Sequence, residues 1–495
     1  MRLGPEQIVP RPPHDRRRSF RSLPARAFLA MLAVLPGCST VNSVSNVVLG
    51  PSGPPLGQPG HVRGFLGGVV ADEPRAALAG RDVLSAGGSA ADAAVAVALA
   101  LAVTYPSRAG LGGGGACLAY APDTGGPAKG MPQAAIFNPL APAASGANAD
   151  RPAAIPMLAR GLFLLHAHYG VLPFEALAGP AERMAASGVP VSRALAKDLA
   201  LVAGPLLADP GARSVFSRDG VPLTEGQTLR QPDLAGTLGQ IRGAGVGDLY
   251  QGAMAHRIAL ESAQIGGPLT FDDLRGALPK LMTPLIQAYH NNKIAFLPPP
   301  ADGGLAAQAA FGTLSNSTGA IAAANARALA VVARYRAGGV TPDQVLAAAN
   351  LTAAPAVLFP ASTGFVTLDR DGNAVACVLT LNNLFGTGRI LPGLGFLAAA
   401  SPAAVPAPLL AAGLVWNDRK DAFLAAVAGS GQSAAPLAVA LALTDTLQTG
   451  RPVSSRIPDP GRANIVACAK YLPGDTASCA WTNDPRESGL AIGSN

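Results

Sequence analysis

The sequence feature that most constrains the fold is an apolar, alanine-rich stretch from Ala90 to Val103 that leads into a glycine-rich loop. The residues Ser89-Ala90-Ala91-Asp92 resemble a capping box and predict the start of a buried helix that continues through Val103. The loop Gly110–Gly115 matches the GxGxxG pattern of dinucleotide sites, in which a strand precedes the glycines and a helix follows them. Here the helix precedes and the strand-like Ala116–Tyr120 follows. This order excludes a Rossmann-type dinucleotide site.

Helical periodicity dominates the middle of the chain. Residues 155–283 alternate amphipathic stretches, such as Ala176–Ser187 and Met254–Ser262, with turns, and are expected to pack as helices. Residues 306–352 are rich in alanine and are also predicted to be helical. A short strand is expected earlier, at Gly67–Ala71.

The pattern changes to strands near residue 365. Phe365–Leu368 and Ala374–Leu381 read as two strands, and the Asp371-Gly372 pair between them is a strong turn signal. We therefore expect a hairpin that begins just after Ser362.

Positive charge is concentrated at the N-terminus. The 495 residues carry a formal net charge of +7, but seven of the 37 basic residues precede Cys38, together with only Glu6 and Asp15 on the acidic side. Without that segment 30 basic and 28 acidic residues remain, which is a charge of +2. The basicity therefore gives no support to nucleic-acid binding. With 49% hydrophobic and 14% charged residues, the chain is also no disordered or coiled-coil protein.

The N-terminal segment has the pattern of an export signal. An apolar run, Ala27–Leu35, is followed by Leu35-Pro36-Gly37-Cys38, which resembles a lipobox, and Arg17-Arg18-Ser19-Phe20 resembles the twin-arginine motif. An ordinary export signal with extra arginines is the alternative. We expect residues 1–37 to be the signal, Cys38 to carry a lipid, and residues 38–60 to be a tether. The protein would then be exported, periplasmic and anchored to a bacterial membrane.

Four cysteines follow Cys38. Cys468 and Cys479 could close a short disulfide loop in an oxidising compartment, whereas Cys117 and Cys377 lie in apolar alternating runs and are expected to be buried thiols. The cysteines and six histidines show no metal-binding spacing. We expect neither a metal nor another cofactor.

Several stretches, in their order and spacing, resemble the gamma-glutamyltranspeptidase family of N-terminal-nucleophile hydrolases. The resemblance covers residues 62–450 and is carried by Gly68–Ala71, Gly87–Ala94, Leu111–Gly115, Pro298–Gly304, Asp369–Val375 and Thr380–Gly388. It implies an α+β fold, a four-layer αββα sandwich, whose precursor cuts itself. The large-subunit-like segment would be residues 61–361 and the small-subunit-like segment residues 362–495.

The resemblance places the nucleophile at Ser362, by counting back from Asp371-Gly372-Asn373 without a gap. Its hydroxyl would attack the Ala361 carbonyl, and the amine released by cleavage would then serve as the base for the same hydroxyl. Thr363 is the competing candidate, but its side chain would point to the opposite face of the strand. A third interpretation, in which Ser362 is only the polar first residue of a strand, stays open.

Three further segments correspond to supporting site residues of the family. Thr380 and Asn382 match positions that support the nucleophile and the amino end of the substrate, and they alternate on one strand face. They could also be ordinary polar residues of a strand and turn. Gly431 and Gln432 occupy the place of the glycine pair that forms the oxyanion hole. Because backbone N–H groups do that work, Gln432 affects the fit more than the number of donors.

The groups that bind the glutamyl head group in this family are missing. Asn138 stands in the stretch where an arginine is expected, and Asn cannot make a bidentate charged contact to a carboxylate. Pro408-Leu409 falls near the expected serine pair, and Leu391–Ala400 offers no clear acidic residue. Arg108 is predicted to be a surface or loop-bracing arginine rather than a substitute for the missing one.

These observations lead to a self-processing amide hydrolase or acyltransferase of the cell envelope with altered head-group specificity. Its substrate would be a small amide or peptide-like molecule. A catalytically inactive relative that serves as a periplasmic binding or structural lipoprotein is the alternative. A third reading is true γ-glutamyl activity with rearranged recognition residues, which would need a cation at the carboxylate position.

Overall fold

The computed structural model describes residues 53–122, 130–143, 149–317, 319–352, 355, 361–454, 456–486 and 488–494. The predicted signal, Cys38 and most of the tether lie outside the described residues. The main elements, in chain order, are β1 (Gly67–Ala71), α2 (Pro74–Ser85), α3 (Ala90–Thr104), β2 (Gly114–Tyr120), β3 (Gln133–Phe137), α4 (Leu158–Tyr169), α5 (Phe174–Ser187), β4 (Val189–Pro190), α6 (Arg193–Leu207), α7 (Pro210–Phe216), β5 (Ser217–Arg218), β6 (Val221–Pro222), β7 (Thr228–Leu229), α8 (Pro232–Ala244), α9 (Asp248–Gln251), α10 (Ala253–Gln264), α11 (Phe271–Gly276), β8 (Lys280–Met282), β9 (Leu285–Tyr289), β10 (Asn292–Phe296), α12 (Gly303–Asn316), α13 (Ile321–Arg336), α14 (Pro342–Ala347), β11 (Ser362–Asp369), β12 (Ala374–Thr380), β13 (Ala411–Asn417), β14 (Ala422–Ser430), the 3₁₀ turn η1 (Gln432–Ala434), α15 (Ala435–Thr449), β15 (Arg462–Leu472), η2 (Thr476–Ser478), β16 (Cys479–Thr482) and β17 (Leu490–Ser494).

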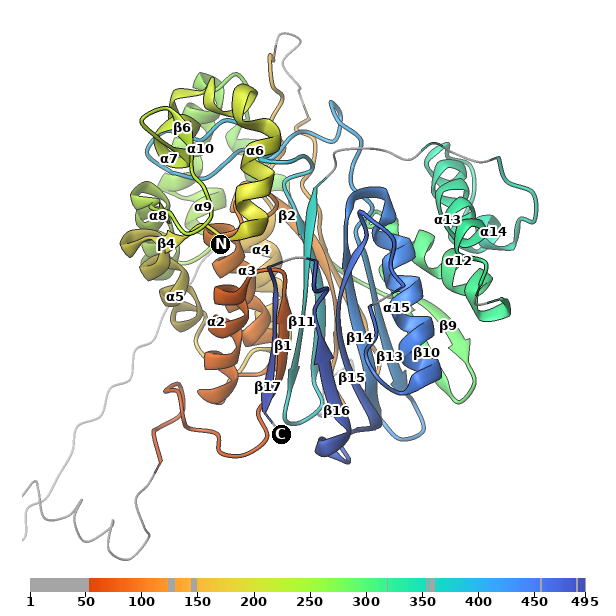
Figure 1. Cartoon of the computed structure of the whole chain (residues 1–495). Coiled ribbons are helices and arrows are strands. Elements are labelled where there is room, and N and C mark those ends of the chain that lie inside the picture. Colours follow the sequence, from red (N-terminus) through yellow and green to blue (C-terminus); the bar gives the residue numbers. More distant parts are fainter. Residues whose placement is uncertain are drawn as a thin grey trace, which may run out of the picture. The chain divides into compact units, whose positions relative to one another are not determined.

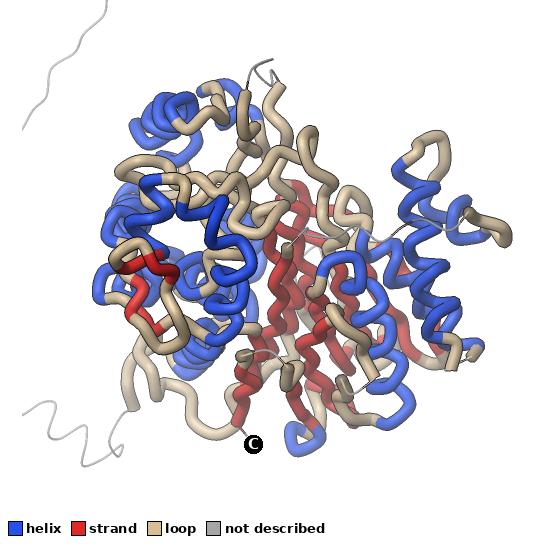
Figure 2. The backbone as a smooth tube through the Cα atoms, turned by 45° about the horizontal axis from the view of Figure 1, so that its top comes forward, coloured by secondary structure: helices blue, strands red, loops and turns tan. Residues whose placement is uncertain are grey.

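Two antiparallel sheets lie face to face between layers of helices (Figures 1 and 2). One sheet has the strand order β17-β1-β11-β12-β2-β3-β8, and the other has the order β16-β15-β14-β13-β10-β9. Helices α2, α3 and α4 pack on strands of the first sheet, while α12 and α15 pack on the second. This arrangement is the predicted αββα sandwich of the α+β class.

Three buried apolar clusters separate the four layers. One lies between the helices and the first sheet, and it includes every apolar residue of α3, which is buried along its length as its apolar sequence predicts. A second lies between α12, α15 and the second sheet. The third fills the space between the two sheets and contains Val70, Val366 and Leu414. The four-layer prediction is therefore confirmed by where the side chains are buried.

The local signals around α3 and the glycine loop are also confirmed. The Ser89 hydroxyl accepts a hydrogen bond from Asp92 N, and the Asp92 carboxylate accepts one from Ser89 N, which completes the predicted capping box. Strand β2 begins within the glycine-rich loop, after the helix. The arrangement of a dinucleotide site is thus not formed here.

The expectation of one helical stretch over residues 306–352 needs correction. The segment is divided among α12, α13 and α14. Gly338 and Gly339, which both have positive φ, end the second helix, and Thr341 and Pro342 start the third as N-cap and first helical residue. The helical region before it likewise contains two short strand pairs, β4 with β7 and β5 with β6.

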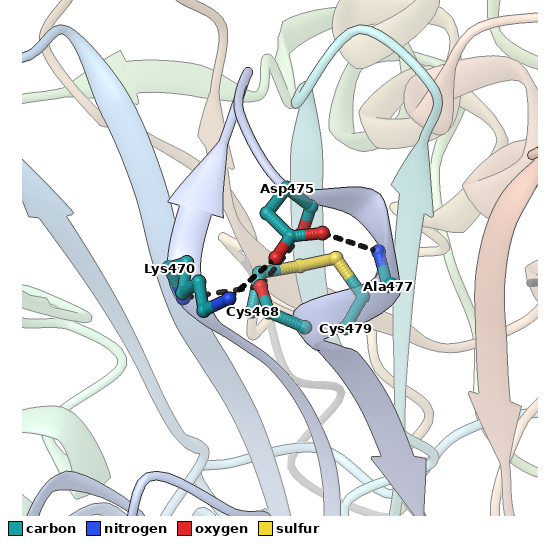
Figure 3. The surroundings of a disulfide bond; sticks show 6 residues. Cys468, Lys470, Asp475, Ala477 and Cys479 are labelled. Atoms are coloured by element: carbon teal, nitrogen blue, oxygen red, sulfur yellow. Dashed lines mark hydrogen bonds and ion pairs between the residues drawn. A yellow bond between two sulfur atoms is a disulfide. The ribbon is translucent and has the colours of Figure 1, made fainter.

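Both cysteine pairs form disulfides. Cys117 and Cys377 are directly paired on β2 and β12 and are bonded to each other, so the expectation of buried free thiols is wrong. The two residues are 260 positions apart, and only the pairing of the strands reveals that they are neighbours. Cys468 and Cys479 form the short-range disulfide considered from the sequence, beside the ion pair of Lys470 and Asp475 (Figure 3).

Each sheet draws strands from both sides of Ser362. Strands β1, β2, β3 and β8 precede it and pair with β11, β12 and β17 in the first sheet, while β9 and β10 precede it in the second. A break in the chain before Ser362 would therefore leave both segments held in the same two sheets. Within the described ranges, no helix has the length and apolar character needed to cross a membrane.

Candidate active site

Ser362 is the first residue of β11, and Thr380 is its partner at the end of β12. The Ser362 side chain is buried, with 2% exposed. Gly364, two residues further on, lies against Ala428 of β14, so Ser362 shares the face that points toward the second sheet. Thr363 alternates with Ser362 along the strand, and its Oγ1 donates to Asp72, so the two hydroxyls have different surroundings.

The Thr380 hydroxyl contacts the carbonyl oxygen of the peptide bond that Ser362 would have to break. Thr380 Oγ1 donates a hydrogen bond of 2.6 Å to the Ala361 carbonyl oxygen and accepts one of 2.8 Å from Asn382 N. A donor on this oxygen stabilises the negative charge that develops when the carbonyl is attacked. This hydrogen bond favours cleavage of the peptide bond before Ser362 rather than of the bond before Thr363.

Asn382 lies beyond the end of β12, so the expected alternation of Thr380 and Asn382 on one strand face is wrong, and Asn382 turns the chain away next to this contact. Its backbone has a left-handed φ of 63°, which Asn adopts more readily than most residues. Its side-chain Nδ2 donates to the Ala400 carbonyl at 2.8 Å. Asn382 thus holds the segment around Ala400 against the end of the hairpin.

Gly431 and Gln432 form the turn that leads from β14 into η1 and α15. A β-carbon at Gly431, where φ is 105°, would lie 2.1 Å from the Pro460 carbonyl oxygen, so only glycine fits. Gln432 adopts a left-handed φ of 60° despite its side chain. At a helix start the first N–H groups have no acceptor within the helix, and no described backbone group accepts from these two. Both can therefore donate to an oxyanion.

Asp72 connects the hairpin to this turn, and the sequence alone did not single it out. Its Oδ2 accepts hydrogen bonds from Thr363 Oγ1 at 2.8 Å and from Ser430 Oγ at 3.4 Å. Ser430 immediately precedes Gly431. The available signal was an acidic residue directly after the apolar strand Gly67–Ala71, a position at which burial is expected to require hydrogen-bond partners.

A cavity of about 360 Å³ adjoins the Asn382 turn. Asn383 and Ala400 belong to its wall, and apolar surface comes from side chains that include Leu206, Leu384, Phe385 and Val405. Arg151 is its basic side chain and donates to the Thr387 carbonyl at 2.8 Å. Asp150 also lines it and forms an ion pair with Arg389.

The other residues considered from the sequence have different surroundings. Asn138 Nδ2 donates to the Pro300 carbonyl at 3.3 Å, so its amide binds the Pro298–Gly304 loop. Arg108 makes two hydrogen bonds of 2.9 Å to Asp198, which confirms that it braces a loop. Within the part of the chain that the structure describes, no group of His, Cys, Asp and Glu side chains is arranged to hold a metal ion.

Comparisons with known proteins agree with this arrangement. The family model of gamma-glutamyltranspeptidase matches residues 76–335, more than half of the chain. The chain is 29% identical over 389 residues to the glutathione hydrolase proenzyme of Escherichia coli (strain K12), a match that covers 68% of this chain and 66% of that protein. It is 28% identical over 383 residues to the acylase ACY 1 proenzyme of Pseudomonas sp. (strain SE83), covering 68% and 69%. The chain thus spans just under two thirds of the Escherichia coli relative.

A solved structure shares the fold over most of the chain. Cephalosporin acylase from Bacillus halodurans superposes with a TM-score of 0.71 at 22% identity, covering 87% of this chain and 96% of the acylase. The sandwich is therefore the fold of the N-terminal-nucleophile hydrolases. Within that class, the chain belongs to the gamma-glutamyltranspeptidase family.

Proposed function

We propose that the protein is a self-processing amide hydrolase or acyltransferase that uses Ser362 as its nucleophile. The observation that carries this proposal is the 2.6 Å hydrogen bond from Thr380 Oγ1 to the Ala361 carbonyl, next to the Ser362 hydroxyl. The carbonyl is thereby polarised at the bond whose cleavage would make Ser362 an N-terminal residue. The relationship to proenzymes named glutathione hydrolase and acylase supports the same chemistry.

Self-processing would proceed through an ester. Ser362 Oγ attacks the Ala361 carbonyl carbon, the bond from that carbon to Ser362 N breaks, and the hydroxyl proton passes to the departing nitrogen. Water then hydrolyses the ester and leaves a carboxylate on Ala361 and a free amine on Ser362. During the attack, the Thr380 hydroxyl stabilises the carbonyl oxygen as it gains negative charge.

The freed serine would carry out the acyl transfer. Its α-amine takes the proton from Oγ, which then attacks the amide carbonyl of the substrate. The backbone N–H groups of Gly431 and Gln432 hold the resulting oxyanion, and the leaving amine receives the proton. The acyl group, now an ester on Ser362, passes to water or to another amine.

The acyl group would differ from a γ-glutamyl group. The cavity beside Asn382 supplies apolar walls and one cation, Arg151, while its carboxylate, Asp150, is paired with Arg389. We take this cavity as the acyl pocket because it adjoins Asn382, although its lining does not include Ser362. An acyl chain with an apolar body and at most one negative charge fits these surroundings. The ammonium of a γ-glutamyl group would lose its hydration there without gaining an unshared carboxylate partner.

We also propose that the protein is exported and attached to a membrane through a lipid on Cys38. The support is the signal-like sequence of residues 1–38. Two disulfides in the described part of the chain favour an oxidising compartment as well. Metabolic labelling with a palmitate analogue tests the anchor, because Cys38→Ala should abolish the label.

Self-processing is tested by expressing the exported chain and determining the N-terminus of each fragment on a denaturing gel. We expect a fragment that begins at Ser362, its absence in Ser362→Ala, and its retention in Thr363→Val. A fragment that begins at Thr363 would move the nucleophile by one residue. A chain that stays intact on long incubation would reject the proposal and favour the inactive binding lipoprotein, which the family relationship does not favour.

Head-group specificity is tested with three p-nitroanilides that carry γ-glutamyl, glutaryl and hexanoyl groups. Glutaryl differs from γ-glutamyl only by the missing ammonium, so we expect it to react at least about tenfold faster if the cavity rejects that charge. Arg151→Gln should slow the glutaryl compound and leave the hexanoyl compound unchanged. A preference for γ-glutamyl would contradict altered specificity and support the rearranged γ-glutamyl site.

A further inference from the structure

Asp72 is a buried carboxylate that lies between the two sheets at the end where Ser362 is found. It follows β1 directly and is 4% exposed. Since Ala71 pairs with Phe365 on β11, the next residue, Asp72, lies opposite Gly364. Its side chain therefore faces the second sheet, as Gly364 does.

Four hydrogen bonds converge on this carboxylate. Oδ2 accepts from Thr363 Oγ1 at 2.8 Å, from Gly364 N at 3.1 Å and from Ser430 Oγ at 3.4 Å. Oδ1 accepts from Asn464 Nδ2 at 2.7 Å. An ionised carboxylate has only acceptors and can take all four donors, whereas an amide offers a single acceptor oxygen.

The donors come from both sheets. Thr363 and Gly364 belong to β11, while Ser430 ends β14 and Asn464 lies on β15 of the opposite sheet. Asn464 Nδ2 also donates to the Gly364 carbonyl at 2.7 Å, which adds a direct bond between the sheets. Figure 1 shows these strands facing one another across the middle of the sandwich.

The contacts lie one residue from each half of the proposed active site. Thr363 follows the nucleophile Ser362, and Ser430 precedes Gly431, the first oxyanion donor. We propose that Asp72 is a positioning residue that fixes the Ser362 hydroxyl relative to the N–H groups of Gly431 and Gln432. This inference rests on the proposed function, and it assigns Asp72 no contact with the substrate.

The decisive variant is Asp72→Asn, which keeps the side-chain shape but turns an amide N–H₂ toward Asn464 Nδ2. Because a misplacement of about 1 Å can cost about 100-fold in rate, we expect kcat for acyl transfer to fall about 10- to 100-fold, with KM within about threefold of wild type. The rate of self-cleavage should fall by a similar factor.

The matched control is Asp369→Asn at the other end of β11. Asp369 is also 4% exposed and accepts several hydrogen bonds, but it lies beside Asn373 in the hairpin turn. We expect this variant to lower the midpoint of thermal unfolding and to leave kcat of the folded protein unchanged. A general loss of stability would affect both variants alike, whereas positioning affects only Asp72→Asn.

Asn464→Ala is a second variant that leaves Asp72 with three donors. It should lower kcat about tenfold, and the double variant with Asp72→Asn should lose little more than the worse single variant, because both remove the same bond. Additive losses would overturn positioning through Asn464. If wild type is not cleaved at Ser362, the proposed function fails; if wild type is cleaved and the Asp72→Asn and Asn464→Ala variants keep its kcat, only the role of Asp72 fails.

Discussion

The two ends of the β11–β12 hairpin differ in how completely their polar groups are satisfied. At the turn, the Asp369 carboxylate accepts hydrogen bonds from Ala90 N, Asp371 N, Asn373 N and Asn373 Nδ2, and the position that needs a positive φ is a glycine. At the other end the Ser362 hydroxyl has no hydrogen-bond partner among the described residues. The hairpin thus ends on one side in a fully bonded turn and on the other in the Ser362 hydroxyl, which remains available for chemistry beside the bonded hydroxyls of Thr363 and Thr380.

Backbone strain is distributed in the same way. The hairpin turn uses Gly372, with φ of 88°, where a left-handed conformation costs little. The active-site end places Asn382 and Gln432, which are not glycines, in left-handed conformations. Such residues persist only where the surrounding structure holds them, and they also occur away from the site, at Asp219, His290, Asp421 and Tyr471. The difference predicts that equivalent substitutions will affect stability at one end and catalysis at the other.

The largest contrast should come from replacing one glycine at each end by alanine. In Gly431→Ala the new β-carbon would lie 2.1 Å from the Pro460 carbonyl oxygen, which must displace the turn that supplies the oxyanion donors. We expect kcat to fall about 1,000-fold, as for loss of an oxyanion donor. Gly372→Ala, with its β-carbon 2.6 Å from the Leu472 oxygen, should lower the unfolding temperature and leave kcat of the folded protein intact.

These variants are compared by thermal unfolding and by kcat with the best p-nitroanilide substrate. Wild-type kcat in Gly431→Ala would show that the turn is not the oxyanion hole. A loss of kcat in Gly372→Ala without loss of stability would remove the distinction between the two ends.

The turn should also respond to pH. Burial raises the pKa of the Asp369 carboxyl to about 6, although the hydrogen bonds that the carboxylate accepts act to lower it. In the unfolded chain the pKa is about 3.9, so the folded protein holds this proton more tightly. The contribution of Asp369 to stability is therefore complete below about pH 4 and is lost as the pH rises through about 6. It amounts to about 3 kcal/mol.

Chemical denaturation of wild type and Asp369→Asn between pH 4 and 7 measures this contribution. The free energy of unfolding of wild type relative to the variant should fall by about 2 kcal/mol over that range, which is most of the total contribution. A constant difference, or one that grows as the pH rises, would show that the folded protein does not hold the Asp369 proton more tightly than the unfolded chain.

A pair of threonines gives a smaller and more selective contrast. Thr380→Val removes the hydroxyl that donates to the Ala361 carbonyl, and we expect self-cleavage to slow about 10- to 100-fold. Thr367 Oγ1 donates to the Ala90 carbonyl at 2.7 Å, away from the site, so Thr367→Val should cost about 1 kcal/mol of stability and leave the cleavage rate unchanged. Time courses on denaturing gels measure the cleavage rate of each variant. A rate in Thr380→Val equal to that in Thr367→Val would show that Thr380 does not assist cleavage.

The sequence alone was sufficient for features whose residues lie close together in the chain. The hairpin from Ser362 to Thr380 could be predicted because turn chemistry and alternation are local signals. The capping box that opens α3 is equally local. The strand boundary differed slightly, since β11 begins at Ser362 itself rather than after it.

Features that depend on distant pairings could not be predicted. The bond from Thr363 to Asp72 joins residues 291 positions apart, and nothing near Asp72 in the sequence shows which strand it faces. For the same reason, the sequence predicts separate thiols at Cys117 and Cys377 and not the disulfide between them. The catalytic roles of Ser362 and Thr380 stay predictions. The positions of their hydroxyls permit the reaction, and the cleavage experiments measure whether it takes place.

The smallest expected effect comes from Gln432→Gly, which removes strain from the active-site end. A non-glycine residue in a left-handed conformation costs about 1–2 kcal/mol, and glycine's greater freedom in the unfolded chain offsets about 0.5–1 kcal/mol of that cost. We therefore expect a gain in stability below about 1 kcal/mol, measured by thermal unfolding. Since the backbone N–H remains, kcat should stay within about threefold of wild type. A larger loss of kcat would show that the Gln432 side chain itself contacts the substrate. The replacement of the family's second glycine by Gln432 would then serve substrate recognition and would not be merely a strained residue that the fold tolerates.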